Sequence, residues 1–305
     1  MDPLADILTR AGVRSTLGAR IDAGSDWGWW AEQASDAAFH AVTAGTAWVS
    51  VAGAEPVELM PGDVVLLPHG TAHVLGSDRG AVERTTATRF DGAEEAGPGV
   101  IRIGIGETRT QIVCAHYTHD PAVETDVLAL LPDVVLIRAA SAPSLSSAIR
   151  LIGLELTDPQ LASEVVVNRL VDVLLVQILR AWLAAQPEAA LPSWLSGLRD
   201  PVVRAAVSEL HADPAGPWTT ATLASAVAVS RATLSRRFAA AVGESPGAYL
   251  TRWRMDLAAQ RLRDTDDPID AIASGVGYTS VYAFNRAFSR ARSVPPGRFR
   301  TLARA

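Results

Sequence analysis

The sequence of 305 residues contains no lysine, one cysteine and few aromatic side chains, 6% of the total. A single cysteine, Cys114, excludes an intramolecular disulfide, and the first residues lack the basic and apolar segments of a secretory signal. The most apolar stretch, residues 165–183, carries five polar or charged side chains, too many for a membrane span. These absences predict a cytoplasmic protein with no membrane partner.

The charged residues are distributed unevenly along the chain. All 27 basic residues are arginine; residues 1–198 hold 12 of them against 24 acidic residues, and residues 199–305 hold 15 against 9. The net charges are therefore −12 and +6. A basic final third indicates that this end meets a polyanion. The alternative is that its arginines only keep helix faces in solution.

Composition also changes along the chain. Short β-type runs between glycine and proline turns fill Ser25–Val113, which is typical of an antiparallel sandwich or barrel, and a loop is expected over Asp91–Pro98. Leu145–Leu156 and Ser163–Ala185 read as helices. We therefore predict an α+β multidomain chain with a β-barrel domain over residues 1–135, a helical segment over 136–186, a linker over 187–200 and an all-α domain over 201–305.

The second predicted helix carries an apolar stripe formed by Val166, Leu170, Val173, Leu174, Ile178 and Leu179. Such a stripe packs either on its own β domain or on a second copy of the chain. Its width favours the seam of a homodimer.

The final third contains a degenerate repeat with helix-turn-helix spacing. Each copy has a small alanine in a first helix, a short turn, and a serine, Ser230 or Ser280, that opens the second helix as its N-cap. The second copy has one extra residue, Thr279. Apolar residues four apart in each second helix face the core, so Arg236 and Arg286 project outward, where an arginine can contact guanine or phosphate.

One helix, Tyr249–Leu262, joins the two copies. A rigid helix would hold both copies against successive major grooves, about 34 Å apart. Arg252, Arg254 and Arg261 in this helix, and Arg263 directly after it, are candidates for phosphate contact.

Several motifs of this region, Gly243–Pro246, Val276–Ser280, Phe284–Phe288 and Pro295–Arg300, resemble the DNA-binding domain of the AraC/XylS regulators. The resemblance implies double-stranded DNA as a partner. It places the DNA-contacting positions on Ser230, Arg231, Ala232, Ser235 and Arg236 in the first unit and on Ser280, Val281, Tyr282, Asn285 and Arg286 in the second. Arg292-Ser293 departs from the family pattern, because an aromatic residue and a glycine are usual there.

In the β domain, Gly62–His73 is similar to the second cupin motif, and the segment implies a cupin-like sensor domain. The first cupin motif is reduced to His40, so the standard site of three histidines and a glutamate is absent. The remaining His40, His73, Cys114 and His116 predict a tetrahedral site for zinc or a similar ion. The alternatives are buried core residues, or an oxidant-sensing thiol at Cys114.

Four aromatic residues near the first strands either line an effector pocket or plug the barrel end: Trp27, Trp29, Trp30 and Phe39. Together the two halves predict a transcription regulator, more an activator than a repressor, that acts with RNA polymerase and answers to a small molecule, metal or oxidant. The competing hypotheses are a metal-dependent cupin enzyme with an appended DNA-binding domain and a DNA-binding protein whose cupin half is only a scaffold.

Overall fold

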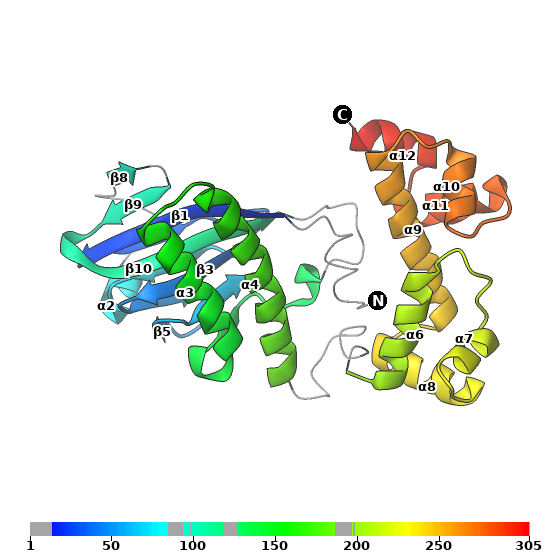
Figure 1. The fold of residues 1–305 in the computed structure, drawn as a ribbon, viewed down its shortest axis with the longest axis horizontal. Coiled ribbons are helices and arrows are strands. Elements are labelled where there is room, and N and C mark those ends of the chain that lie inside the picture. The colour runs from blue at the N-terminus through cyan, green and yellow to red at the C-terminus, as the bar shows by residue number, and fades with distance from the viewer. Residues whose placement is uncertain are drawn as a thin grey trace. The chain divides into compact units, whose positions relative to one another are not determined.

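The computed structural model describes residues 14–84, 94–97, 99–118, 127–186, 197 and 199–304 (Figure 1). These residues divide into two compact units, one formed by the described residues within 14–118 and 128–186 and the other by residues 127, 197 and 199–304. In the described part of the chain, no helix is both long enough and apolar enough to cross a membrane.

Two sheets form the N-terminal unit. The larger has the order β11-β6-β3-β10-β1-β9-β8, with β1 (Arg14–Ser25), β3 (Ala37–Ala44), β6 (Val64–Leu67), β8 (Glu94–Gly97), β9 (Val100–Ile103), β10 (Ile105–Thr118) and β11 (Val135–Ile137). The smaller has the order β2-β7-β4-β5, with β2 (Gly28–Ala31), β4 (Ala47–Val51), β5 (Val57–Leu59) and β7 (His73–Gly76). The predicted β domain is confirmed as an open sandwich, and β1 with β9 is a parallel pair.

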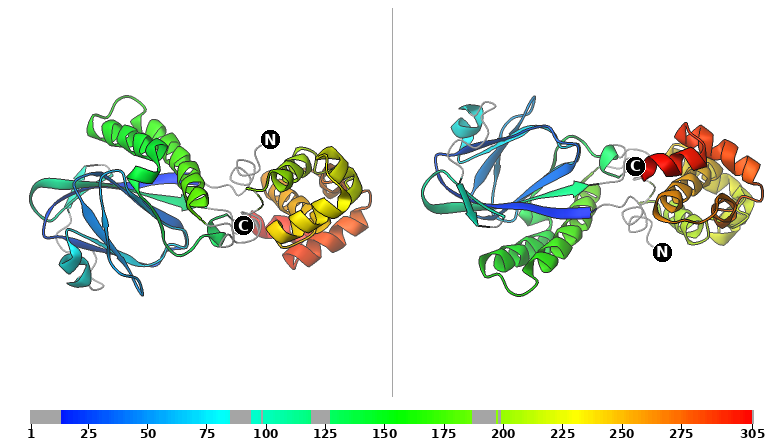
Figure 2. Two further views of the ribbon diagram at one scale, coloured as in Figure 1. Left: turned by 90° about the horizontal axis from the view of Figure 1, so that it is seen from below. Right: turned by 90° about the horizontal axis from the view of Figure 1, so that it is seen from above.

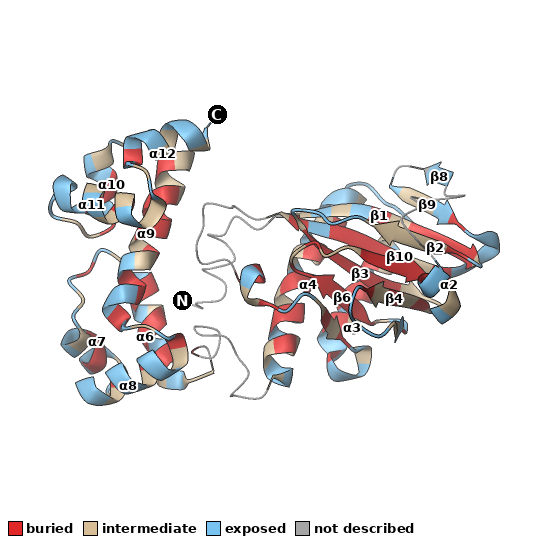
Figure 3. Cartoon of the chain, turned by 180° about the vertical axis from the view of Figure 1, so that it is seen from behind, coloured by how far each residue is buried: buried red, intermediate tan, exposed pale blue. Residues whose placement is uncertain are grey.

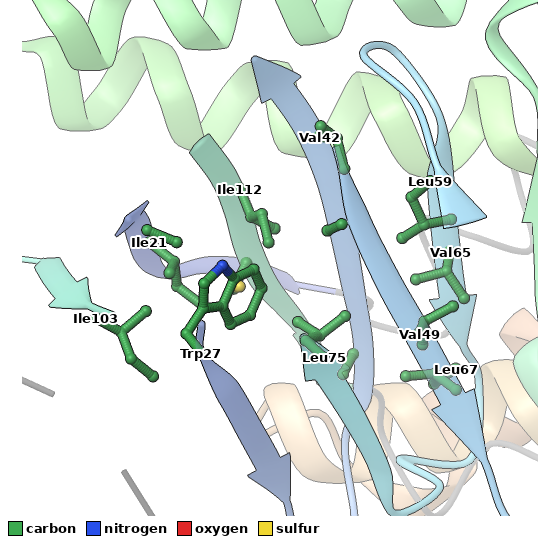
Figure 4. Packing of buried hydrophobic residues seen from close by; sticks show 14 of the residues in the cluster. Ile21, Trp27, Val42, Val49, Leu59, Val65, Leu67, Leu75, Ile103 and Ile112 are labelled. Carbon is green, nitrogen blue, oxygen red and sulfur yellow. The ribbon is translucent and has the colours of Figure 1, made fainter. Parts of the chain in front are cut away.

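An apolar core fills the space between the sheets. Figure 4 shows side chains from both sheets in this core, among them Ile112 and Val42 from the larger sheet and Val49 and Leu75 from the smaller. Alternation along each strand produces this core, because successive side chains point to opposite faces. Trp27 lies inside it, 3% exposed.

One predicted loop is a strand. Strand β8 lies within Asp91–Pro98, which was expected to be a loop, and pairs with β9 through Glu94 opposite Arg102 and Glu95 opposite Ile101. The expectation is wrong for residues 94–97. Pairing with β9 makes this segment a strand, although its glycine and glutamate residues have a low propensity for strands.

Two long helices, α3 (Pro143–Thr157) and α4 (Ser163–Ala185), cover the outer face of the larger sheet (Figure 2). The Tyr117 hydroxyl of β10 donates to the Val171 carbonyl of α4 at 2.9 Å, and the Ser15 hydroxyl of β1 donates to Asp172 at 2.5 Å. The helical segment is therefore part of the sandwich unit. Short elements complete it: α2 (Arg79–Arg84), η1 (Leu128–Leu130) and η2 (Ala139–Ser141).

The apolar stripe of α4 divides between two faces. Leu174, Ile178 and Leu179 are buried, whereas Val166 and Val173 are exposed. The stripe as predicted is therefore not one seam, because the sheet takes its larger part through the packing of α4 on β1 and β11.

The C-terminal unit is entirely helical in its described part, with α6 (Pro201–Ala212), α7 (Thr220–Ala226), α8 (Arg231–Val242), α9 (Pro246–Asp264), α10 (Ile269–Gly275), α11 (Val281–Arg292) and α12 (Pro296–Ala303). The predicted repeat is confirmed as two helix-turn-helix units, α7 with α8 and α10 with α11. The same hydrogen bonds close both turns: Val229 N to Ala224 O in the first and Tyr278 N to Ala273 O in the second.

The two recognition helices end in the same left-handed backbone conformation but with different residues. Gly243 follows α8 at φ 81°, and Ser293 follows α11 at φ 59°. Glycine adopts this conformation without steric cost, whereas a serine Cβ contacts its own backbone there. The departure from the family pattern at Ser293 therefore leaves the helix end in place and adds strain to it.

Ser293→Gly should stabilise the C-terminal unit by about 1 kcal/mol, since it removes this left-handed strain. Scanning calorimetry of the intact chain measures the change as a higher midpoint for the C-terminal transition. The reverse change, Gly243→Ser, is the matched control and should lower that midpoint. An unchanged or lower midpoint for Ser293→Gly would contradict the strain argument.

Candidate DNA-binding surface and sensor site

The recognition helices α8 and α11 begin at the predicted serine caps. The Ser230 hydroxyl accepts a hydrogen bond from the Thr233 N–H at 3.1 Å, and the Ser280 hydroxyl accepts one from the Ala283 N–H at 3.4 Å. Both caps satisfy backbone donors that the first helical turn leaves without partners. Ser230 and Ser280 thus have a structural role at the start of each reading helix.

Each recognition helix buries one face and exposes the other (Figure 3). The buried face carries the predicted apolar pairs, Leu234 with Phe238 and Phe284 with Phe288, all fully buried. The exposed face carries most of the predicted DNA-contacting residues, namely Arg231, Ala232, Ser235, Arg236, Val281, Tyr282 and Arg286. The structure thus brings these residues onto one surface of each helix.

Asn285 departs from this arrangement. It is half-buried, and its side-chain oxygen is buried without a hydrogen-bond partner among the described residues. In this orientation the oxygen does not face solvent, so Asn285 is placed less favourably for a DNA contact than its exposed neighbours.

Arg236 and Arg286 differ from most arginines of this unit. Both are exposed, and neither makes an ion pair or hydrogen bond with a described residue. In contrast, Arg237, adjacent to Arg236, donates to the Asp200 carboxylate at 2.7 Å. Guanidinium groups that lack an internal acid keep their full donor capacity for a phosphate or a guanine edge.

The four arginines of α9 all have partners within the unit. Arg252 pairs with Glu244 at 2.6 Å, Arg261 pairs with Asp267 at 2.6 Å, and Arg263 pairs with Asp264. Arg254 donates to the carbonyl oxygens of Pro214 and Gly216. These contacts give the α9 arginines a structural role that the spacing did not reveal, and contact with phosphate stays a prediction.

A buried ion pair connects α9 to the second recognition helix. The Arg292 guanidinium, at the end of α11, donates to the Asp256 carboxylate in the middle of α9, and both side chains are almost completely buried. Removing one partner of such a pair leaves a buried charge without compensation, which costs several kcal/mol. The pair therefore fixes α11 on the joining helix, and Arg292 stands where the family pattern has an aromatic residue.

In the sensor unit, three of the four candidate metal ligands form a buried chain. The Cys114 sulfur lies 2.9 Å from Nδ1 of His40, and Nε2 of His40 lies 2.7 Å from Nε2 of His73. Nδ1 of His73 lies 2.8 Å from the Thr71 carbonyl oxygen. Trp29 packs edge-on against the His40 ring. The chain crosses from the larger sheet, which carries His40 and Cys114, to the smaller sheet, which carries His73.

The contact between His73 and the Thr71 carbonyl determines which group donates and which accepts in every hydrogen bond of this series. The Thr71 carbonyl only accepts, so Nδ1 of His73 donates and its Nε2 accepts from the Nε2–H of His40. Nδ1 of His40 then accepts from the Cys114 thiol. Burial lowers the pKa of His40 and of His73 and raises the pKa of the Cys114 thiol, so that all three groups are neutral.

The side chains as placed do not form the tetrahedral set that the spacing predicts. Cys114 and His73 contact opposite nitrogen atoms of the His40 ring, so one ion cannot bind all three. His116 shares a face of β10 with Cys114, but its side chain is exposed and lies over Gly18. Among the described residues, no group of three or more histidine, cysteine or acidic side chains is arranged to hold a metal ion.

The aromatic residues near the first strands divide between several environments. Trp27 lies in the core and Trp29 packs against it. Trp30 is half-buried, and Phe39 stacks on Tyr117 on the opposite face of the sheet. They therefore do not line one common pocket.

The sequence analysis did not identify the Thr71 carbonyl as a partner of His73, because a backbone carbonyl is present at every residue and leaves no signal in the sequence.

The comparisons with known proteins agree with both halves of the structure. A cupin family model matches residues 2–184, and a helix-turn-helix domain model matches residues 223–301. A protein of Streptomyces antibioticus described as an AraC-like transcription regulator is 39% identical over 98% of both chains. The HTH-type transcriptional regulator MtrA of Neisseria gonorrhoeae is 32% identical over 86% of this chain and 85% of its own.

A solved structure of the DNA-binding domain of AdpA, in complex with a target DNA, is 27% identical over 34% of this chain and 93% of its own, with a TM-score of 0.32. The fold and the matches together define a DNA-binding transcription regulator with an N-terminal cupin domain. The chain belongs to the AraC-like transcription regulators.

Acidification should destabilise the sensor unit. His40 and His73 have lower pKa values in the folded chain than the 6.5 of an unfolded chain. Their contribution to the stability of the folded state is therefore complete above pH 6.5 and is lost as pH falls toward their folded pKa values. The slope is at most about 1.4 kcal/mol per pH unit for each histidine. Calorimetry between pH 8 and pH 5 measures it.

His40→Gln is the comparison variant, because it keeps a polar side chain but cannot titrate. Its sensor unit should show a weaker pH dependence than the natural chain, whatever its stability at pH 8. Equal slopes for the two proteins would contradict the assignment of the pH dependence to this chain of groups.

Proposed function

We propose that the two helix-turn-helix units of this regulator read DNA through Arg236 and Arg286. The observation that carries the proposal is that both arginines occupy the same position in the two copies, are exposed, and have no acidic partner among the described residues. A surface arginine that only solvates its helix would have no reason to recur at the equivalent position of both units. The net charge of +6 over residues 199–305 supports attraction to the phosphate backbone.

The joining helix α9 supports simultaneous reading by both units. Its 19 residues span about 28 Å at the usual rise of an α-helix. The Asp256–Arg292 pair and the packing of α9 against α8, α10, α11 and α12 keep it rigid. We expect the recognition helices to enter successive major grooves on one side of the duplex.

We further propose that the active form is a homodimer that pairs through α3 and α4. The faces of these helices turned away from the sheet expose Leu151, Leu154, Val166 and Val173, between 42% and 58%. Apolar side chains gathered on two adjacent helices are typical of a protein interface. The second copy of the chain would cover the part of the predicted stripe that the sheet leaves open.

In this proposal the cupin unit senses an effector and does not catalyse a reaction. Cys114 and His73 occupy both nitrogens of His40 in a closed chain, which leaves no open coordination position of the kind that a metal enzyme needs. The effector is a small molecule, a metal or an oxidant that alters the hydrogen bonds among Cys114, His40 and His73. Binding of one transition metal ion stays a prediction that requires the His40 ring to turn. Activation together with RNA polymerase is an expectation from family resemblance.

Arg236→Ala and Arg286→Ala should each weaken binding to a DNA fragment selected by the intact protein by about 1–3 kcal/mol, because each removes one base or phosphate contact. Fluorescence anisotropy at fixed salt measures the affinities. Arg109→Ala, which removes an exposed arginine of the sensor unit, is the charge-matched control and should bind normally. Unchanged affinity of both recognition-helix variants would defeat the assignment.

Val173→Glu should convert the dimer into a monomer, since it places a charge on the apolar face. Sedimentation equilibrium measures the molecular mass in solution. Ile105→Glu introduces the same charge at a more exposed apolar residue, 67% exposed and outside α3 and α4, and should leave the mass unchanged. A natural chain that is already monomeric, or a Val173→Glu variant that stays dimeric, would overturn the proposed interface.

A further inference from the structure

The second recognition helix carries an exposed aromatic residue next to its reading arginine. Tyr282 is 72% exposed and lies four residues before Arg286 on α11. The Arg286 guanidinium carbon lies 5.9 Å from the centre of the Tyr282 ring. This is the upper end of the distance over which a cation and an aromatic ring attract each other.

The first recognition helix lacks this partner. Its reading arginine, Arg236, is preceded four residues earlier by Ala232, the position equivalent to Tyr282. The two helices otherwise share the serine cap, the buried apolar pair and the outward arginine. The molecule therefore contains its own comparison: one reading arginine with an aromatic partner and one without.

From this difference we propose that Tyr282 is a positioning residue, which orients the Arg286 guanidinium and makes the second unit the more selective of the two. The inference rests on the proposed DNA-reading role of Arg286. An arginine side chain has many rotamers, and fixing it on DNA costs conformational entropy. A ring that already holds the guanidinium on one side lowers this cost for the one geometry that donates two hydrogen bonds to guanine.

The remaining contacts of Arg286 favour this role for Tyr282. Arg286 has no carboxylate partner among the described residues, so the ring is the group that biases its direction. An acidic partner would hold the guanidinium too, but would have to be broken before DNA could bind. An aromatic face leaves all five N–H donors free while it restricts the side chain.

The test is an in vitro selection from random double-stranded DNA with the intact protein, followed by affinity measurements on the selected sequence and on its single base-pair changes. Arg286→Ala first identifies the base pair whose discrimination depends on Arg286. Tyr282→Ala should then reduce discrimination at that same base pair about threefold, the fold-change expected of an exposed cation–aromatic contact. The base pair that depends on Arg236 should be unaffected.

Three further variants separate the ring from its other properties. Tyr282→Phe keeps the ring and should keep the discrimination, whereas Tyr282→Leu keeps apolar bulk and should lose it. Ala232→Tyr supplies the missing ring and should sharpen discrimination at the base pair of Arg236. Thermal midpoints of all variants should match that of the natural chain, because both positions are exposed.

Other results would overturn the proposal in identifiable ways. Loss at a different base pair in Tyr282→Ala would mean that the tyrosine reads that base itself. Loss in Tyr282→Phe would assign the effect to the hydroxyl group. Unchanged discrimination in Tyr282→Ala would mean that Arg286 reads its base pair without help from Tyr282. If the natural protein selected no sequence, or Arg286→Ala changed no base preference, the proposed DNA-reading role would fail first.

Discussion

The alternation of side chains along β10 is the constraint on which the sensor unit depends. This strand pairs with β1 on one side and β3 on the other, so it occupies the middle of the larger sheet. One of its faces directs Cys114 toward the sandwich core, and the other directs Tyr117 toward α4. A strand with period-two geometry cannot shift by one residue without exchanging these faces. The strand that carries Cys114 on one face is thus tied to the backbone of α4 by Tyr117 on the other.

The same alternation explains how far sequence reasoning could go at the histidine and cysteine residues. The two-residue spacing of Cys114 and His116 correctly placed both on one face of a strand. It gave no information on how deeply each side chain lies, and His116 is exposed whereas Cys114 is buried. It also gave no ring orientation, so the placement of Cys114 and His73 at opposite nitrogens of His40 followed only from the structure. Metal ligands must have their donor atoms directed at one point. The period of a strand shows only on which face of the strand each residue lies.

In the C-terminal unit, more of the structure could be predicted from the sequence, because it depends on interactions between residues close together in the chain. Caps, turn lengths and apolar pairs four residues apart are determined within a dozen residues, and both helix-turn-helix units follow them. The α9 arginines could not be assigned in this way, because their partners, such as Asp267 for Arg261 and the carbonyl of Pro214 for Arg254, lie in the flanking loops. The division of the α4 stripe had the same cause: the sequence shows that a face is apolar, and tertiary packing decides what covers it.

The repeat itself gives a way to separate structure from function in this regulator. Both copies retain the hydrogen bonds that close the turn and the buried pair that holds the recognition helix. Among the positions that differ, three do not contribute to this frame: Ala228 in one turn where the other has Gly277, Gly243 where the other has Ser293, and Ala232 where the other has Tyr282. The first two differences change only the strain of left-handed residues. The third changes the chemistry next to an exposed arginine, and in our proposal it makes the second unit the more selective of the two.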